Sequence, residues 1–437
     1  MTAVAASPVH RALPVDAGDL LSQLRREGGV FVADHAGLRL ASHFQPIYSL
    51  SHGRVVGHEA LLRASDAQGR PVPPPQVFDL GDDLDELWRR DWLARAVHLA
   101  NHAVAPPADQ WLFLNAHPAL FGGWREGEVR SFTDTVMHRF GIPPQRLVIE
   151  VLESALATQP QQVEASIRNA REHGCLIALD DFGAGHSNFD RVWRLKPEIV
   201  KLDRSLVARA AGDRAVRRMI VQLVSLLHEC GALVLMEGIE TTEEAFVALE
   251  SDADLVQGYL FGRPQAALAA AERAPNALEA VWRDFEGRWR DDQLAGADRL
   301  QPYREALQSA ALHMMAGVPL PTACAAFLDL PGAELCYMLG ADGRQIGDNC
   351  WAERVRQATL GRPASLAFAP LRDARGARWS RRPYFRRAVQ QPAQVQTTRP
   401  YRTLHGGHLS VTVSIAFAPA ATAALQVLCG DVAWDTL

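Results

Sequence analysis

The sequence predicts an α/β fold: a modified TIM (β/α)8-type barrel with an antiparallel first strand, then a helical connector and a small α+β domain. Between residues 18 and 265, eight short apolar segments alternate with amphipathic stretches. Such alternation is typical of parallel sheets, and eight strands suggest closure into a barrel. The first two segments are joined only by Ser51-His52-Gly53-Arg54, too short for a crossover helix. Those two strands should therefore form an antiparallel hairpin.

The composition is that of a globular chain with two domains. A length of 437 residues exceeds what one ordinary core supports. Hydrophobic residues make up 48 % and charged residues 22 %, which argues against wholesale disorder. The formal net charge of -5 excludes a global positive field of the kind that attracts nucleic acid or anionic membranes. We therefore expect no nucleic-acid partner.

Signals for membrane insertion or secretion are missing from the sequence. No apolar run approaches the roughly 18 residues that a membrane span needs. The N-terminus lacks a basic start followed by an apolar stretch. None of the six cysteines forms a C-x-x-C pair, which fits free thiols in a reducing compartment. We expect no membrane span and a cytoplasmic localisation.

The barrel elements follow in order through residues 18–270, after a loose leader at residues 1–17. Amphipathic helical stretches, such as residues 88–105 and 214–231, separate most of the strands. The strand candidates are HFQPIYSL (43–50), RVVGHEALLR (54–63), WLFLNAHP (111–118), RLVIEVLE (146–153), CLIALDDFG (175–183), EIVKLD (198–203), ALVLMEGIE (232–240) and DLVQGYLFG (254–262).

A connector at residues 271–319 and a second domain at residues 320–437 complete the chain. Trp282, Phe285 and Trp289 fall on one helical face of the connector, which predicts packing on the barrel or on a homodimer mate. The second domain has short alternating segments separated by Gly and Asp turns, typical of a small antiparallel sheet with flanking helices. These segments are ELCYMLG (334–340), HLSVTVSIAFA (408–418) and ALQVLCGDVAW (424–434).

Charged and amide residues gather at the C-terminal ends of the predicted barrel strands. This rim is where barrel active sites lie. Strand alternation places Glu59 on one face with Arg63, and Lys201 on one face with Asp203. The residues at the strand ends are Glu59, Asn115, Glu150, Asp180, Asp181, Lys201, Asp203 and Glu237.

Five of these carboxylates crowd the rim of otherwise apolar strands and are costly unless they are paired or bind metal. They are Glu59, Glu150, Asp180, Asp181 and Glu237. Two divalent cations together with Lys201 would balance them. All-oxygen ligands suit Mg²⁺ or Mn²⁺ rather than zinc. Two such ions, about 3.5–4 Å apart, are the usual apparatus for displacement at phosphorus. The alternative is a set of structural salt bridges at the strand ends.

The ordered motifs resemble those of EAL-type cyclic di-GMP phosphodiesterases along about 220 residues. GHEALLR contains the Glu59-Ala60-Leu61 signature, and Glu150 with Glu153 matches an E-x-x-E motif. His117 and Ala184 stand where the family usually has Ser and Thr. The remaining matches are FQPI (44–47), LNAHP (114–118), DDFGAG (180–185), KLD (201–203), EGIE (237–240) and QGYLFGRP (257–264).

The resemblance implies a role for each matching residue. Lys201 would position the attacking water or stabilise charge, Glu153 would brace the loop at residues 181–187, and Glu237 would be a metal ligand or general base. The expected product is linear pGpG, and the alternative is a receptor that binds cyclic di-GMP without cutting it. The implied metal ligands are Glu59, Asn115, Glu150, Asp180, Asp181 and Glu237, and the implied substrate contacts are Gln45, Arg63, Asp203, Glu240 and Gln257.

The second domain contains seven arginines within residues 372–387, RDARGARWSRRPYFRR. One interpretation is a nucleic-acid patch with stacking aromatic rings; a solvated face or a surface for an acidic partner fits the acidic chain better. The region also resembles Cache- or PAS-like sensor domains. In such domains an aromatic–arginine cluster with a later aspartate holds a small anion or amino acid. The matching residues are Trp379, Arg382, Tyr384 and Asp431.

Overall fold

The computed structural model describes residues 17–81, 83–104, 110–116, 138–158, 160–185, 189–266, 268, 276–359, 374–402, 409–419 and 424–434. Most of the predicted leader, His117 and Ser187 lie outside these ranges. The chain divides into two compact units, Met1–Glu286 and Gly287–Leu437. The division falls inside helix α11 (Asn276–Met315), within the predicted connector.

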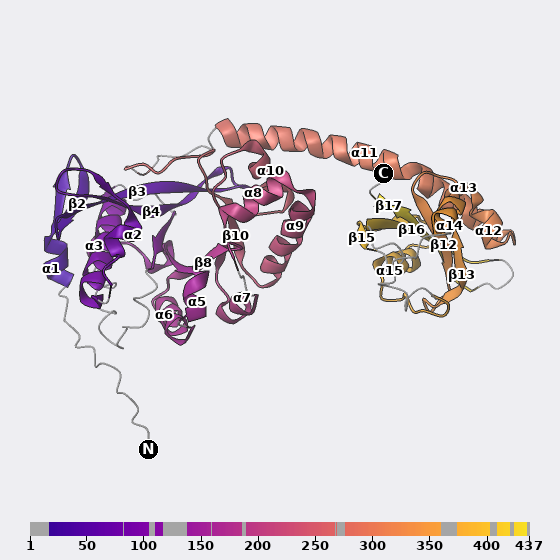
Figure 1. Ribbon diagram of the computed structural model, residues 1–437, viewed down its shortest axis with the longest axis horizontal. Helices are drawn as coiled ribbons and strands as arrows, with labels where there is room; N and C mark the ends of the chain where they lie inside the picture. The colour runs from indigo at the N-terminus through magenta and orange to yellow at the C-terminus, as the bar shows by residue number, and fades with distance from the viewer. Residues whose placement is uncertain are drawn as a thin grey trace, which may run out of the picture. The chain divides into compact units, whose positions relative to one another are not determined.

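A closed barrel of eight strands forms the first unit (Figure 1). The first strand is antiparallel to both of its neighbours, and the other neighbouring pairs are parallel. The predicted modified barrel is thus confirmed. The strands, in chain order, are β3 (Leu38–Ser49), β4 (Arg54–Ser65), β6 (Trp111–Asn115), β7 (Leu147–Leu152), β8 (Leu176–Phe182), β9 (Ile199–Leu202), β10 (Leu233–Met236) and β11 (Leu255–Val256).

The hairpin of β3 and β4 is the element that reverses the first strand. Ser49 pairs with Arg54 at the turn, and Gln45 lies opposite Glu59 further along the ladder. Gly53 in the turn has φ 60, a left-handed conformation that glycine adopts without a steric cost. A tight link of this kind can join only antiparallel strands.

Short additions before and after the hairpin extend the sheet beyond the barrel. β2 pairs with the first half of β3 and β1 pairs with β2, both antiparallel. The sequence gives little sign of β1, because its residues Leu-Arg-Arg-Glu lack apolar alternation and are half-buried or exposed. The additional elements are α1 (Ala17–Ser22), β1 (Leu24–Glu27), β2 (Val30–His35) and β5 (Pro71–Val72).

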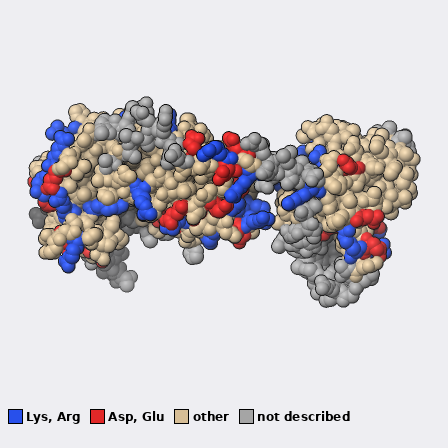
Figure 2. All heavy atoms as spheres, turned by 90° about the horizontal axis from the view of Figure 1, so that it is seen from above, with Lys and Arg blue, Asp and Glu red and all other residues tan. Residues whose placement is uncertain are grey.

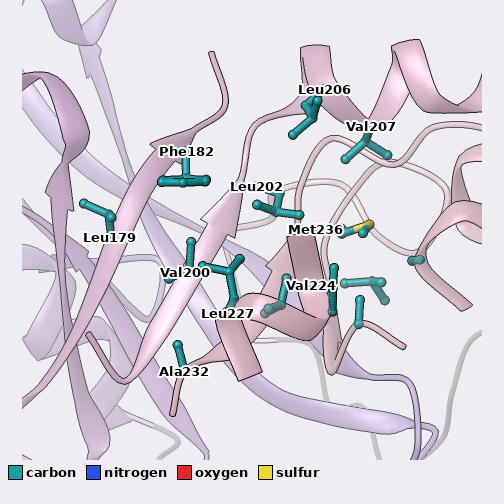
Figure 3. Close-up of a cluster of buried hydrophobic side chains, with 14 of the residues drawn as sticks. Leu179, Phe182, Val200, Leu202, Leu206, Val207, Val224, Leu227, Ala232 and Met236 are labelled. Carbon is teal, nitrogen blue, oxygen red and sulfur yellow. The ribbon is translucent and has the colours of Figure 1, made fainter. Parts of the chain in front are cut away.

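Helices pack on the outside of the barrel strands. Figure 3 shows Leu179 and Phe182 from β8 in one buried cluster with side chains of α8 and α9, including Leu206 and Leu227. Each fully buried side chain of this size stabilises the fold by about 1.5–3 kcal/mol. The helices are α2 (Pro74–Phe78), α3 (Leu84–Val104), α5 (Glu153–Thr158), α6 (Pro160–Glu172), α7 (Phe189–Leu195), α8 (Arg204–Gly212), α9 (Arg214–Glu229) and α10 (Thr242–Glu250), with a 3-10 turn at Pro144–Arg146.

The beginning of α11 packs on the barrel unit. The indole nitrogen of Trp282 donates to the Leu50 carbonyl oxygen at 3.1 Å, and the Phe285 ring stacks on Phe246 with centroids 6.4 Å apart. These two residues of the predicted aromatic stripe therefore contact the barrel, while the Trp289 side chain lies outside the described residues.

The second unit is built on a six-stranded antiparallel sheet in the order β13-β12-β17-β16-β14, with β15 also paired to β16. This confirms the predicted small α+β domain. Its strands are β12 (Ala333–Leu339), β13 (Gln345–Trp351), β14 (Gln396–Thr397), β15 (Tyr401–Arg402), β16 (Leu409–Phe417) and β17 (Gln426–Ala433). Its short helices are α12 (Leu320–Ala323), α13 (Ala325–Leu328), α14 (Glu353–Thr359) and α15 (Pro383–Gln390).

Charges of both signs share the surface of the barrel unit. Figure 2 shows acidic and basic side chains next to one another on one face, and ion pairs such as Arg39 with Glu27 join some of them. Among the residues that the structure describes, no helix combines the length and apolar character needed to cross a membrane.

Candidate active site

An apolar layer inside the barrel supports the candidate site. Seven strands each contribute one buried hydrophobic side chain to this layer, and at Gly57 of β4 an added Cβ would approach Phe113 Cε2 to 3.0 Å. The strands pack tightly here and leave no room for polar groups. The layer consists of Ile47, Phe113, Val148, Ala178, Ile199, Leu235 and Leu255.

A polar layer lies two residues away along every strand, toward the C-terminal ends of the parallel strands. Because side chains repeat with period two, each polar residue points to the same side as the residue of the inner layer two positions away. Eight polar side chains therefore converge at this end of the barrel. They are Gln45, Glu59, Asn115, Glu150, Asp180, Lys201, Glu237 and Gln257.

Three carboxylates form a compact group in this polar layer. Asp180, Asp181 and Glu237 each offer one carboxylate oxygen, and these three oxygens lie within 4.8 Å of one another. Asp181 has φ 59, a left-handed conformation uncommon for residues other than glycine. This turn breaks the strand alternation and brings Asp181 beside Asp180. The group has the hard oxygen donors that Mg²⁺ and Mn²⁺ prefer.

Lys201 lies in the middle of the acidic cluster. Its Nζ is 2.5 Å from Glu150 Oε1, 2.7 Å from Glu237 Oε1 and 3.2 Å from Asp180 Oδ1. Burial alone lowers the pKa of Lys201, but the surrounding carboxylates outweigh burial and hold the pKa well above its usual range. The carboxylates around this buried side chain therefore favour its positively charged form.

The buried charges are not balanced by Lys201 alone. Glu150 is 1 % exposed, and burial with its acidic neighbours raises its pKa well above the usual range despite Lys201. Burial likewise raises the pKa of Glu237 to about 8 and raises that of Asp181. Neither oxygen of Glu150 accepts a well-directed hydrogen bond from any described residue, although one is in charge contact with Lys201. Salt bridges alone therefore do not account for the cluster, and further positive charge would stabilise it.

Two amides orient Glu59 at the opposite side of the polar layer. Asn115 Nδ2 donates to Glu59 Oε1 at 3.1 Å, and Gln257 Nε2 donates to Glu59 Oε2 at 2.9 Å. Both carboxylate oxygens are thus held by strands β6 and β11. This leaves the amide oxygen of Asn115 available as a further hard donor.

A cavity of about 800 Å³ adjoins the polar layer. Glu59, Arg63 and Asn115 line one side of it, together with Leu61 between the charged residues of β4. The predicted phosphate contact Arg63 therefore lies in the same cavity as two predicted metal ligands. A cavity of this volume is in the range of small-molecule sites.

The opposite wall of the cavity carries polar residues that sequence reasoning missed. Asp91, Arg95 and His98 of α3 line it, and Arg95 Nη2 lies 2.7 Å from Asp91 Oδ2. Their spacing of four and three residues along α3 puts them on one helical face, which is a signal visible in the sequence. Burial raises the pKa of Asp91 to about 6 and lowers that of His98 to about 3.

Of the other predicted substrate contacts, Asp203 and Glu240 follow strands β9 and β10, and Gln45 lies on β3. Asp203 caps α8, where its Oδ1 accepts from the Ser205 amide at 3.0 Å. Glu240 pairs with Arg204 at 2.9 Å. Gln45 donates to the Gly262 carbonyl oxygen at 3.2 Å, so it connects β3 to the segment after β11.

Glu153 lies directly after β7 and is 6 % exposed. Arg191 of α7 donates through one nitrogen to Glu153 Oε1 at 2.9 Å and to the Glu153 carbonyl oxygen at 3.1 Å. The acidic residue thus contacts a helix beyond β8, and Arg191 is a partner that the motifs do not indicate.

The second unit contains a separate polar cluster around Asp431. This carboxylate is 3 % exposed, accepts from Thr412 Oγ1 at 2.7 Å, and has its pKa raised by burial to about 7. Tyr401 Oη lies 2.6 Å from the same Thr412 oxygen. Tyr384 is buried near Asp431, and burial raises its pKa. The structure thus adds Tyr401 and Thr412 to the predicted residues.

Arg382 lies against aromatic rings at the start of α15. Its guanidinium carbon is 5.9 Å from the Trp379 ring centroid and 5.8 Å from that of Tyr401. The buried Nε of Arg382 has no hydrogen-bond partner among the described residues. Trp379 donates to Gln345 Oε1 at 3.1 Å. Arg382 and the buried carboxyl group of Asp431 therefore lie near the same two tyrosines, Tyr384 and Tyr401.

Comparisons with known proteins identify relatives of part of this chain. The cyclic di-GMP phosphodiesterase RocR of Pseudomonas aeruginosa is 28% identical over 225 residues, which cover 51% of this chain and 57% of RocR. A protein of Azorhizobium caulinodans is 31% identical over 237 residues and is matched over 31% of its length. The chain thus spans between about a third and about half of these relatives.

A solved structure resembles nearly the whole chain. It is the Bacillus subtilis YkuI protein with an EAL domain, in complex with cyclic di-GMP and calcium, with a TM-score of 0.75 at 18% identity. The likeness covers 97% of this chain and 100% of that one, and it supports the fold of both units. The EAL domain model matches residues 33–264, which is more than half of the sequence. This chain belongs to the EAL domain family.

Proposed function

We propose that this protein hydrolyses cyclic di-GMP to linear pGpG. The observation that carries the proposal is the group of Asp180, Asp181 and Glu237 beside the buried Lys201 at the C-terminal rim of the barrel. RocR, a relative that shares the barrel sequence, is named a cyclic di-GMP phosphodiesterase. The adjoining cavity with Arg63 offers space and a cation for a phosphate-bearing substrate.

The residues of the polar layer would have different roles in the reaction. Asp180, Asp181 and Glu237, with Glu59, Asn115 and Glu150, would hold two divalent cations. When bound, Mg²⁺ or Mn²⁺ supplies Lewis acidity that lowers the pKa of the attacking water and offsets phosphoryl charge.

Protein groups orient the substrate and complete the charge balance. Lys201, fixed by three carboxylates, would stabilise the negative charge that develops at phosphorus. Arg63 would donate to a phosphate oxygen. Gln45, Gln257 and the loop residues Asp203 and Glu240 would contact guanine and ribose.

The test is metal-dependent product formation. Purified protein is incubated with cyclic di-GMP and Mg²⁺, Mn²⁺ or Ca²⁺, and pGpG is quantified by chromatography. Turnover should need Mg²⁺ or Mn²⁺, vanish with chelator, and be poor with Ca²⁺, whose bonds of about 2.3–2.6 Å exceed the 2.0–2.1 Å of Mg²⁺. Binding without turnover under all conditions would instead identify a cyclic di-GMP receptor.

A second candidate function concerns the C-terminal unit. We infer that it senses a small zwitterion such as a free amino acid. The buried Asp431, which no described cation pairs with, would accept an ammonium group, and Arg382 between Trp379 and Tyr401 would bind a carboxylate.

Thermal unfolding of the full chain with each common amino acid tests the sensor proposal. A ligand at 100 times its Kd stabilises the folded unit by about 2.7 kcal/mol. At least one amino acid should raise the unfolding temperature of the native chain and of Arg381→Ala, but not of Arg382→Ala. No response from any amino acid would refute this ligand class.

A further inference from the structure

An ion pair between Glu153 and Arg191 lies beside the metal-ligand cluster without belonging to it. We propose that Arg191 is a positioning residue for this cluster and acts through Glu153. The kinetic part of the proposal rests on the proposed hydrolysis, but its structural part concerns metal affinity alone. Arg191 is on α7, and Glu153 begins α5.

The location of the pair connects the ends of two ligand-bearing strands. Leu152, the last residue of β7, pairs with Asp180 of β8, so Glu153 follows one step beyond that pairing. Arg191 belongs to the first helix after β8. The ion pair therefore ties the exit of β7 to the helix that follows Asp180 and Asp181.

The contact with Arg191 restrains both the backbone and the side chain of Glu153. One guanidinium nitrogen of Arg191 donates to Glu153 Oε1 at 2.9 Å and to the Glu153 carbonyl oxygen at 3.1 Å. A charge-assisted bond to a carboxylate and a second bond to the main chain together restrain rotation and displacement. A hydrophobic side chain in place of Arg191 could do neither.

The neighbouring Asp181 needs such restraint. Its φ of 59 is unfavourable for a residue with a side chain, and such conformations persist only where the surroundings enforce them. The Phe182 ring, directly after Asp181, contacts the Phe189 ring of α7 with centroids 5.7 Å apart. Ala184 has no side-chain hydroxyl, and Arg191 gives Glu153 a polar contact to α7.

Burial distinguishes Arg191 from the other arginine of α7. The side chains of Arg191 and Glu153 are 22% and 8% exposed. Arg194 is 59% exposed and lies 3.3 Å from Glu164 and 3.7 Å from Asp190, a pattern typical of weak surface pairs. Loss of Arg191 would remove a positive charge beside the buried Glu153 carboxylate. Loss of Arg194 would remove only a pair at the surface.

The experiment compares Arg191→Met with Arg194→Met in the full-length protein. Isothermal titration with Mn²⁺ alone measures metal affinity after chelator treatment. Arg191→Met should weaken Mn²⁺ binding by about 10- to 100-fold, as expected for loss of a residue that orients metal ligands. Arg191→Lys should recover part of this loss, and Arg194→Met should match the native protein.

Kinetics and a double variant complete the test. In Arg191→Met, kcat for cyclic di-GMP should fall with little change in KM, because the substrate contacts remain in place. Adding Glu153→Gln to Arg191→Met should weaken Mn²⁺ binding no further, since both changes break the same contact. Additive losses would contradict a role through Glu153.

The proposal fails if Arg191→Met binds Mn²⁺ as tightly as Arg194→Met does. Glu153→Gln keeps the size of the side chain but removes its charge and therefore the ion pair with Arg191, so it supplies the same comparison should Arg191→Met not fold. A native protein that binds Mn²⁺ but never cleaves cyclic di-GMP would refute the proposed hydrolysis. The effect of Arg191 on Mn²⁺ affinity would still be measured in that case.

Discussion

The position and charge of Lys201 depend on carboxylates from several strands at the rim of the barrel. It is 1% exposed and surrounded by three carboxylates, so its charge is fixed in place before substrate arrives. Lys201→Met should lower kcat by about 10²–10³, the usual loss for one preorganised donor, with a much smaller change in KM. Steady-state kinetics measures this, with the exposed Lys196→Gln as control. A raised KM at unchanged kcat would contradict the role.

Glu237 makes the stability of the metal-free protein depend on pH. Burial raises its pKa in the folded state to about 8, above the ordinary 4.5. The unfolded chain ionises Glu237 at lower pH, so this group favours folding below about pH 4.5, and the contribution is lost as pH rises to about 8.

Thermal unfolding at a series of pH values measures this effect. Without divalent cations, the unfolding temperature should fall between pH 5 and 8, and Glu237→Gln should reduce the fall. Mn²⁺ should remove most of it in the native protein, because a bound cation favours the carboxylate. A native profile that is identical with and without Mn²⁺ would contradict cation binding at Glu237.

At the scale of elements, the cap of α10 supports the loop that carries Glu240. Thr241 Oγ1 accepts from the Glu244 amide at 3.3 Å, and Glu244 Oε2 accepts from the Thr241 amide at 2.9 Å. Thr241→Ala should cost about 1 kcal/mol of stability. Denaturant unfolding should show this loss for Thr241→Ala and not for Thr242→Ala, which makes no such cap. Equal stability of the two variants would show that the cap contributes nothing.

The sequence predicts the barrel strands well because each is a buried apolar run ending in a polar motif. β1 and β2 escape prediction, since a strand such as Leu24–Glu27 at the sheet edge needs no apolar alternation. The polar layer was predictable for two reasons. Its residues belong to recognisable sequence motifs, and the alternation of side chains along a strand places them on one side. Arg191 was missed because only tertiary packing brings Glu153 near it. Asp91 and Arg95 pair within α3, but only tertiary packing brings that face of the helix to the cavity.

At the scale of the whole molecule, the chain joins a barrel unit to a second compact unit through α11. If the second unit senses a zwitterion, its ligand must bind two states of the protein unequally to alter turnover. The expected change in kcat/KM is about 5- to 150-fold. The ligand should produce this change in the native chain and in Arg381→Ala, but not in Arg382→Ala. If the ligand left kcat/KM unchanged in all three proteins, the two units would work independently.

The most direct test of the central claim is cleavage of cyclic di-GMP in ¹⁸O-labelled water with Mn²⁺, followed by mass spectrometry of the product. Water that attacks phosphorus at the acidic rim should place one ¹⁸O in the terminal phosphate of pGpG. The label should appear with native protein and not with Asp180→Ala. Intact cyclic di-GMP after prolonged incubation, or equal label with Asp180→Ala, would contradict the account.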